Sequence, residues 1–198
     1  MARAYQLKIS LEDIRPEIWR RVVVPGNLNL ERLHGVIQDA MGWEWDHLHE
    51  FAARGMRIGV PDDNGWGRQP IEDQRQWTLE RLYKGRGKFQ YVYDFGDHWS
   101  HEIRIEKIIE AEGTFAPRCV AGERACPPED CGGVGGYLDI VEVLAGKGRR
   151  KAEIRDWLGD EWSPQAFDLE AADRLVARHQ PQPGRRPGRK ETRARAGA

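Results

Sequence analysis

The stretch that decides the fold is residues 89–105, FQYVYDFGDHWSHEIRI. Its two halves alternate apolar and polar side chains with a period of two, which is the pattern of a half-buried β-strand. Between the halves lies Asp94-Phe95-Gly96-Asp97, a segment rich in turn-forming residues. The stretch therefore predicts an antiparallel β-hairpin.

Further strands are predicted on the N-terminal side of this hairpin. Residues 5–11 alternate in the same way, and residues 18–24 are rich in β-branched residues and stop at Pro25-Gly26. These two segments are predicted to pair antiparallel. A second hairpin is predicted over residues 47–60.

Helical periodicity begins directly after the second strand. Apolar residues recur at intervals of three and four over residues 30–41, with Asn29 placed as N-cap and Gly42 as the end. Thr78 is expected to cap a helical turn, whereas two long loops are predicted over residues 61–76 and 113–136. Three more helices are predicted near the C-terminus, at residues 137–144, 153–158 and 163–176.

The composition supports a folded core, with 39% hydrophobic and 32% charged residues. The predicted fold class is α+β: a single domain over residues 1–180, with a mixed, mainly antiparallel sheet and packed helices. Residues 181–198 are predicted to be a disordered basic tail.

No apolar run approaches the roughly 18 residues of a membrane span, so no membrane partner is expected. Three cysteines, an odd number, favour a reducing cytoplasm over a disulfide framework.

The charge is unevenly distributed. The whole chain has a net charge of -1, but residues 181–198 hold six basic residues and one acidic residue, which leaves an acidic body of -6 and a tail of +5. Such a tail suits weak, salt-sensitive contact with nucleic-acid phosphates, and equally a solubilising extension. Its basic residues are Arg185, Arg186, Arg189, Lys190, Arg193 and Arg195.

The strongest candidate site combines imidazoles and carboxylates. In a strand, His47 and His49 would point the same way about 7 Å apart, which suits two ligands of one metal ion. An Asp and a His from the hairpin could complete a site for Zn²⁺, Mn²⁺ or Fe²⁺. The candidate residues are His47, His49, Asp94, Asp97 and His101, and the proposed metal ligands are His47, His49, Asp97 and His101.

These residues also have a structural interpretation. Asp94 and Asp97 are suited to capping the turn around Gly96. The histidines lie near tryptophans in the sequence and could bond the backbone within an aromatic core. A ligand pocket without a metal is the third alternative.

A proline-rich and glycine-rich loop supplies two more candidates. Pro127-Pro128-Glu129-Asp130 precedes four glycines and a predicted helix. A helix N-terminus behind glycines can hold an anion, but Glu129 and Asp130 would repel phosphate. The segment is either a tight surface loop packed on the sheet, or it brings Glu129 or Asp130 to the histidines as acid, base or ligand.

The cysteines follow the spacing C-x6-C-x4-C at Cys119, Cys126 and Cys131. Zinc sites favour cysteine pairs separated by two to four residues, so only the second pair is suitable. The alternatives are a structural zinc site and free thiols in a tight turn.

Four groups of segments, in this order, match a known family. They are IWRRVVVP with LHGVIQDAMGW, HLHEF, YDFGDHWSH, and CPPEDCGGVGGY with a later DWLGDEWSP-x-x-FD. From about residue 3 to residue 178 the chain resembles the Ri-plasmid open-reading-frame-three-like family, some members of which are labelled passenger TnpR or putative resolvase. The candidate histidines and aspartates lie on its HLHEF and YDFGD-x-W-x-H motifs.

The resemblance implies an α+β fold and a bacterial or archaeal setting near mobile elements. It does not imply recombination, because the nucleophilic serine, the arginine constellation and the helix-turn-helix of a serine resolvase are not found in the sequence. Three functions are therefore considered. They are a non-catalytic binding or accessory module of mobile elements, a small metal-dependent enzyme using the His/Asp cluster, and a DNA-associated accessory factor using the tail.

Overall fold

The structure is a computed structural model that describes residues 2–61 and 70–180. Its centre is one eight-stranded sheet made of β1 Ala2–Leu11, β2 Trp19–Pro25, β3 His49–Ala53, β4 Met56–Gly59, β5 Ile71–Asp73, β6 Gly87–Tyr93, β7 Trp99–Ala111 and β8 Arg118–Glu123. The spatial order is β5-β4-β3-β6-β7-β1-β2-β8. Only β4 and β5 pair in parallel, so the predicted mixed, mainly antiparallel sheet is confirmed.

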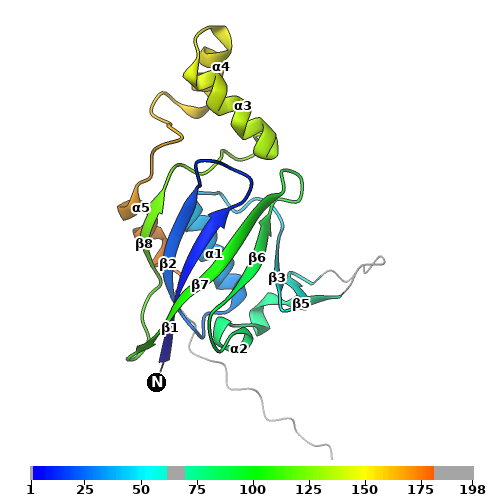
Figure 1. Ribbon diagram of the computed structural model, residues 1–198, viewed down its shortest axis with the longest axis vertical. Helices are drawn as coiled ribbons and strands as arrows, with labels where there is room; N and C mark the ends of the chain where they lie inside the picture. Colours follow the sequence, from blue (N-terminus) through cyan, green and yellow to red (C-terminus); the bar gives the residue numbers. More distant parts are fainter. Residues whose placement is uncertain (1, 62–69, 181–198) are drawn as a thin grey trace, which may run out of the picture.

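The helices lie on one face and at two opposite ends of this sheet (Figure 1). They are α1 Leu30–Met41, the short 3₁₀ helix η1 Gln74–Gln76, α2 Leu79–Leu82, α3 Gly133–Ala145, α4 Arg149–Leu158 and α5 Leu169–Val176. The longest core helix, α1, covers the sheet face, and α5 packs against α1 and β8. In contrast, α3 and α4 extend beyond the ends of the strands (Figure 1).

All three predicted strand pairs are present, including the hairpin of β3 and β4, in which Phe51 lies opposite Ile58. Strands β1 and β2 pair antiparallel, with Leu7 opposite Val22. Strands β6 and β7 form the predicted hairpin, with Tyr91 opposite His101 and Tyr93 opposite Trp99. The alternation of the sequence therefore sets which side chains face the core.

Helix α1 begins and ends where its capping residues predict. The side chain of Asn29 accepts a hydrogen bond from the Arg32 N–H at 3.0 Å. Gly42 ends the helix in the left-handed region at φ 103°. In the last turn of the helix, the Ala40 carbonyl accepts a hydrogen bond from Nε of the buried Arg20 at 2.6 Å. This carbonyl has no partner within the helix, so Arg20 satisfies it.

The structure differs from the sequence prediction at several boundaries. Residues 118–123 form edge strand β8 inside a predicted loop, because the flanking prolines and glycines hide a short alternating run. Residues 71–76 likewise form β5 and η1 rather than loop. Helices α3 and α4 begin before their predicted starts, at Gly133 and Arg149. The last helix begins at Leu169 because Asp168 caps it, and not at Ser163.

Two predicted features lie outside the described residues. The tail at 181–198 is one, and residues 62–69 of the predicted loop at 61–76 are the other. Among the helices that the structure describes, none has the length and apolar character needed to cross a membrane.

Candidate functional site

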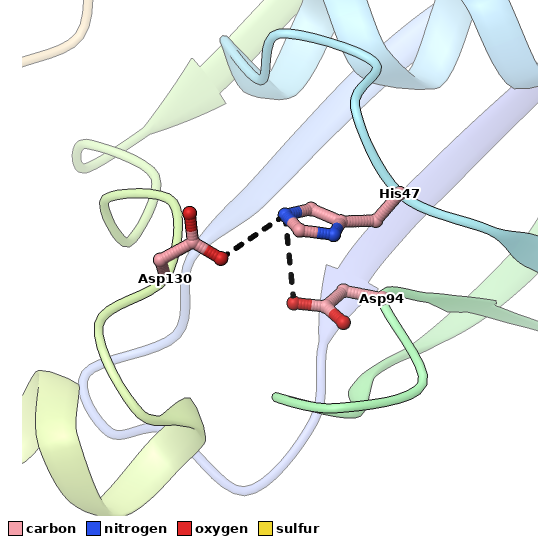
Figure 2. A group of neighbouring side chains, drawn as sticks. All are labelled: His47, Asp94 and Asp130. Carbon is pink, nitrogen blue, oxygen red and sulfur yellow. Dashed lines mark ion pairs between the residues drawn. The ribbon is translucent and has the colours of Figure 1, made fainter.

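Three segments distant in the sequence meet beside the end of β6. His47 comes from the irregular segment between α1 and β3, Asp94 follows the last residue of β6, and Glu129-Asp130 lie in the loop between β8 and α3. Figure 2 shows His47 between Asp94 and Asp130. Of the two alternatives left open by the sequence, the loop of Glu129 and Asp130 therefore lies beside His47 and Asp94.

The centre of the site is Nε2 of His47, which faces three carboxylates. It lies 3.2 Å from Oδ1 of Asp130, 3.9 Å from Oδ2 of Asp94 and 3.9 Å from Oε2 of Glu129. Ligand atoms of His47, Asp94 and Asp130 all lie within 4.8 Å of one another. Donors bound to one ion at about 2.0–2.2 Å are themselves at most about 4.4 Å apart, so the distances from Nε2 suit a shared metal ion.

Asp94 has two functions in this arrangement. Its Oδ1 accepts a hydrogen bond from the Gly96 N–H at 2.8 Å, which is the turn-capping role that the structural interpretation assigned to it. Its Oδ2 is the oxygen that faces His47. Asp94 is buried and adopts φ 53°, a left-handed conformation that Asp tolerates better than most residues. The turn thus fixes the carboxylate toward the imidazole.

Glu129 is held by groups on two other segments. Its Oε1 accepts hydrogen bonds from the Tyr93 hydroxyl and from the Glu44 N–H, both at 2.9 Å. Burial, together with the hydrogen bond to this carboxylate, raises the pKa of Tyr93 well above its usual value. Tyr93 therefore remains a neutral donor to Glu129 at physiological pH.

Asp97 joins the two loops but does not join the cluster. Its Oδ2 accepts a hydrogen bond from the Gly132 N–H at 3.0 Å. On the same side of the site, Nε1 of Trp43 donates to the Pro127 carbonyl at 3.1 Å. These two contacts fasten the loop that carries Glu129 and Asp130 to the rest of the molecule.

The proposed metal set of His47, His49, Asp97 and His101 is not assembled. His47 precedes β3 instead of belonging to it, so the two-residue period of a strand does not place it beside His49. His49 packs inward, where Nε2 bonds Oε1 of Gln74 at 2.7 Å. The four residues therefore cannot bind one metal ion together, because they lie in different parts of the structure.

His101 is fully buried within the aromatic core. Its Nδ1 lies 3.3 Å from the Tyr91 carbonyl, and its ring meets Trp43 edge to face at a centroid distance of 5.2 Å. Burial lowers the pKa of His101 to about 4, so its ring is neutral at physiological pH. This is the structural role that the alternative interpretation described.

Sequence reasoning missed two residues near these groups. His34 of α1 is buried and stacks on His49, and Tyr93 positions Glu129. His34 lies four residues after Leu30, on the apolar face of α1. This position is the only feature of the sequence that could have predicted that His34 is buried. Tyr93 gave no signal beyond its inward place in the alternation of β6.

The cysteines do not contribute to a metal centre in the described ranges. All three have free thiols, and no group of three potential ligands there includes a cysteine. Burial raises the pKa of Cys119 to about 11 and that of Cys131 to about 12. These thiols are therefore poor nucleophiles.

The donor set has clear chemical preferences. One imidazole nitrogen with two or three carboxylate oxygens suits Zn²⁺, Mn²⁺ or Fe²⁺. Asp130 is 76% exposed, whereas the Asp94 side chain is 10% exposed, so the site has a buried side and a side open to solvent. An ion could enter past Asp130.

Comparison with known proteins gives consistent matches over most of the chain. The model of a family described as plasmid pRiA4b ORF-3-like protein matches residues 3–171. Uncharacterized protein y4hQ of Sinorhizobium fredii is 43% identical over 161 residues, which cover 80% of this chain and 82% of that protein. The crystal structure of MM3350, a protein of unknown function from Methanosarcina mazei Go1, has a TM-score of 0.77 and 38% identity, and the match covers 86% of this chain and 97% of that one.

Proposed function

The chain belongs to the plasmid pRiA4b ORF-3-like protein family, and from that premise we propose that it is an accessory binding module whose site holds a divalent metal ion. The proposed ligands are His47, Asp94 and Asp130. The plasmid in the family name supports a setting among mobile elements.

The observation that carries the proposal is the placement of three carboxylates around one imidazole nitrogen. Carboxylates from two other segments, the end of β6 and the loop before α3, direct oxygens at Nε2 of His47, at 3.2, 3.9 and 3.9 Å. Carboxylates held this close repel one another unless a cation or proton lies between them. A divalent cation held by His47, Asp94 and Asp130 would offset that repulsion.

The geometry of the individual ligands supports the same proposal. Asp94 is fixed by the Gly96 turn before any ion arrives, which reduces the entropy that ordering it would cost. Asp130 is exposed and adopts φ 53°, a left-handed conformation of the kind that concentrates at functional sites. One preformed ligand and one accessible ligand suit reversible ion binding.

A metal-dependent enzyme is the second candidate. The number of proposed ligands favours it, because catalytic zinc sites have three protein ligands and keep one position open for water or substrate. His47, Asp94 and Asp130 would be such a set of three. The number of protein ligands therefore separates the binding module from the enzyme.

Metal titration tests the proposal. Protein treated with chelator and then titrated with Zn²⁺ or Mn²⁺ in a calorimeter should take up one ion per chain. H47Q, D94N and D130N should each weaken binding by tenfold or more, since even changes to groups outside the ligand set cost about 10–100-fold. In D94N the remaining amide oxygen can still accept from the Gly96 N–H, so that variant should keep the turn.

Asp46 provides the matched control. It is an exposed carboxylate directly before His47 and does not belong to the ligand group. D46N should bind the ion as tightly as the wild type does. The proposal fails if the wild type takes up no ion, or if the three ligand variants match D46N.

A further inference from the structure

The two oxygens of Glu129 have different environments. Oε1 accepts two hydrogen bonds, from Tyr93 and from the Glu44 N–H. Oε2 is buried and, among the described residues, has no hydrogen-bond partner. It lies 3.9 Å from Nε2 of His47. One oxygen is therefore anchored, and the other is directed into the site without a donor.

A buried carboxylate oxygen without a donor is costly in a folded protein, because it has lost water and gained nothing in return. Such a group calls for an explanation in terms of an ion, a water molecule or a function. Here the environment supplies an electrostatic explanation, since Nε2 of His47 lies 3.9 Å from this oxygen and also faces the carboxylates of Asp94 and Asp130. A cation shared with these groups satisfies the oxygen.

We propose that Glu129 is the fourth protein ligand of this site and that Tyr93 holds it in the binding position. The inference rests on the proposed metal function and deepens it. Four protein ligands form a closed site, as in structural zinc centres, whereas three leave a position open for chemistry. With Glu129 as the fourth ligand, a tetrahedral Zn²⁺ would keep no open position, which favours a binding site over a catalytic one.

Tyr93 acts on the metal through Glu129. Its hydroxyl hydrogen fixes Oε1, which turns Oε2 toward His47. Its ring packs on Trp43 with centroids 4.9 Å apart, so the hydroxyl has little freedom to move away. Hydrogen bonds of this kind to metal ligands set ligand orientation and affinity.

Binding of Co²⁺ in place of the natural ion distinguishes the proposed ligand Glu129 from its positioning residue Tyr93. The visible absorption of bound Co²⁺ reports the number and type of its ligands. In E129Q an amide NH₂ can occupy the place of Oε2, while the amide oxygen still accepts from Tyr93 and the Glu44 N–H. E129Q should weaken Co²⁺ binding and should also change the wavelength and intensity of the saturated spectrum.

Y93F should weaken Co²⁺ binding by about 10–100-fold but leave the saturated spectrum unchanged, because the ligand set is the same. Y83F is the matched control, since the buried Tyr83 donates its hydroxyl to the Lys88 carbonyl at 3.1 Å, away from the site. Y83F should leave both the affinity and the spectrum as they are in the wild type.

The outcomes distinguish the two proposals. If the wild type binds no Co²⁺, Zn²⁺ or Mn²⁺, the proposed function itself fails. If the wild type binds Co²⁺ and E129Q has the same affinity and spectrum, Glu129 is no ligand, and only the present inference is overturned. A Y93F variant that binds as the wild type does would remove the positioning role of Tyr93.

Discussion

At the scale of single residues, His34 and His49 form a stacked pair of imidazoles between α1 and the sheet. Their ring centroids are 3.5 Å apart and their planes differ by 4°. His34 Nδ1 lies 2.8 Å from the Tyr91 hydroxyl, and His49 bonds Gln74. Burial lowers the pKa of His34 to about 3, with His49 and His179 adding to the effect, and burial also lowers the pKa of His49. Both rings are neutral in the folded protein at pH 7.

This pair makes stability depend on pH. Between pH 6.5 and about 3 the unfolded chain takes up a proton on His34 and the folded chain does not, so the free energy of unfolding falls as the pH falls. The expected slope is about 1.4 kcal/mol per pH unit from this imidazole. Urea unfolding at pH 7 and at pH 5 measures it.

H34Q should be less stable than the wild type at pH 7 but should lose less stability on acidification. H98N is the control, because His98 is exposed and Asn tolerates its left-handed φ of 59°. Equal pH slopes in the wild type and H34Q would show that the stacked pair does not control acid stability.

At the scale of elements, the start of α3 touches the turn between β6 and β7. Gly133 has φ 67°, and a Cβ added to it would lie 2.6 Å from the Asp97 carbonyl oxygen. The neighbouring Gly132 N–H bonds the Asp97 side chain. This close approach of two backbones fixes the loop that carries Asp130 relative to the turn that carries Asp94.

Substitution of Gly133 should therefore damage both stability and the site. G133A should lower the free energy of unfolding by about 1–3 kcal/mol, through the left-handed conformation and the clash. It should also weaken metal binding, because Asp130 moves with the loop. Chemical unfolding and calorimetric titration measure the two effects.

Gly135, two residues further along α3, is the matched control. An added Cβ there would meet nothing within 4 Å. G135A should leave metal binding unchanged and stabilise the helix by up to about 1 kcal/mol. If G133A behaves like G135A, the contact between the loop and the turn does not hold the site.

The elements also show what the sequence could predict. Alternation located the paired strands and capping residues located α1, because both signals are local. The edge strand β8 was not predicted because it is short and lies within a region rich in proline and glycine. The sequence placed His47, Asp94, Glu129 and Asp130 among its candidates, but it left their convergence open, and its metal set also included residues that lie apart from them. His47 lies outside the strand, and His49 and His101 pack into the core, so a two-residue period could not separate site residues from core residues.

At the scale of the whole molecule, the charge asymmetry predicts the form that any contact with nucleic acid would take. Residues 181–198 carry +5 and the remainder carries -6. Contact with phosphates through six basic side chains releases counterions, so binding should be weak, independent of sequence and sharply reduced by salt. Fluorescence anisotropy with a short labelled DNA duplex at low and at physiological salt measures this.

Two variants identify the binding segment. Removal of residues 181–198 should abolish DNA binding, and so should replacement of the six basic residues by serine in the full-length chain. DNA binding that survives both changes would exclude the tail as the binding segment and would point to the acidic body instead.

The meeting of three distant segments at His47 has a kinetic consequence. The segments that carry Asp94 and Asp130 must each close a long loop before their oxygens face the imidazole, so the centre is complete only after the chain has reached its native topology. If the proposed metal ion binds only the completed centre, it would stabilise interactions that a transition state without this centre lacks. It would prolong the lifetime of the native protein against unfolding and leave the rate of folding unchanged.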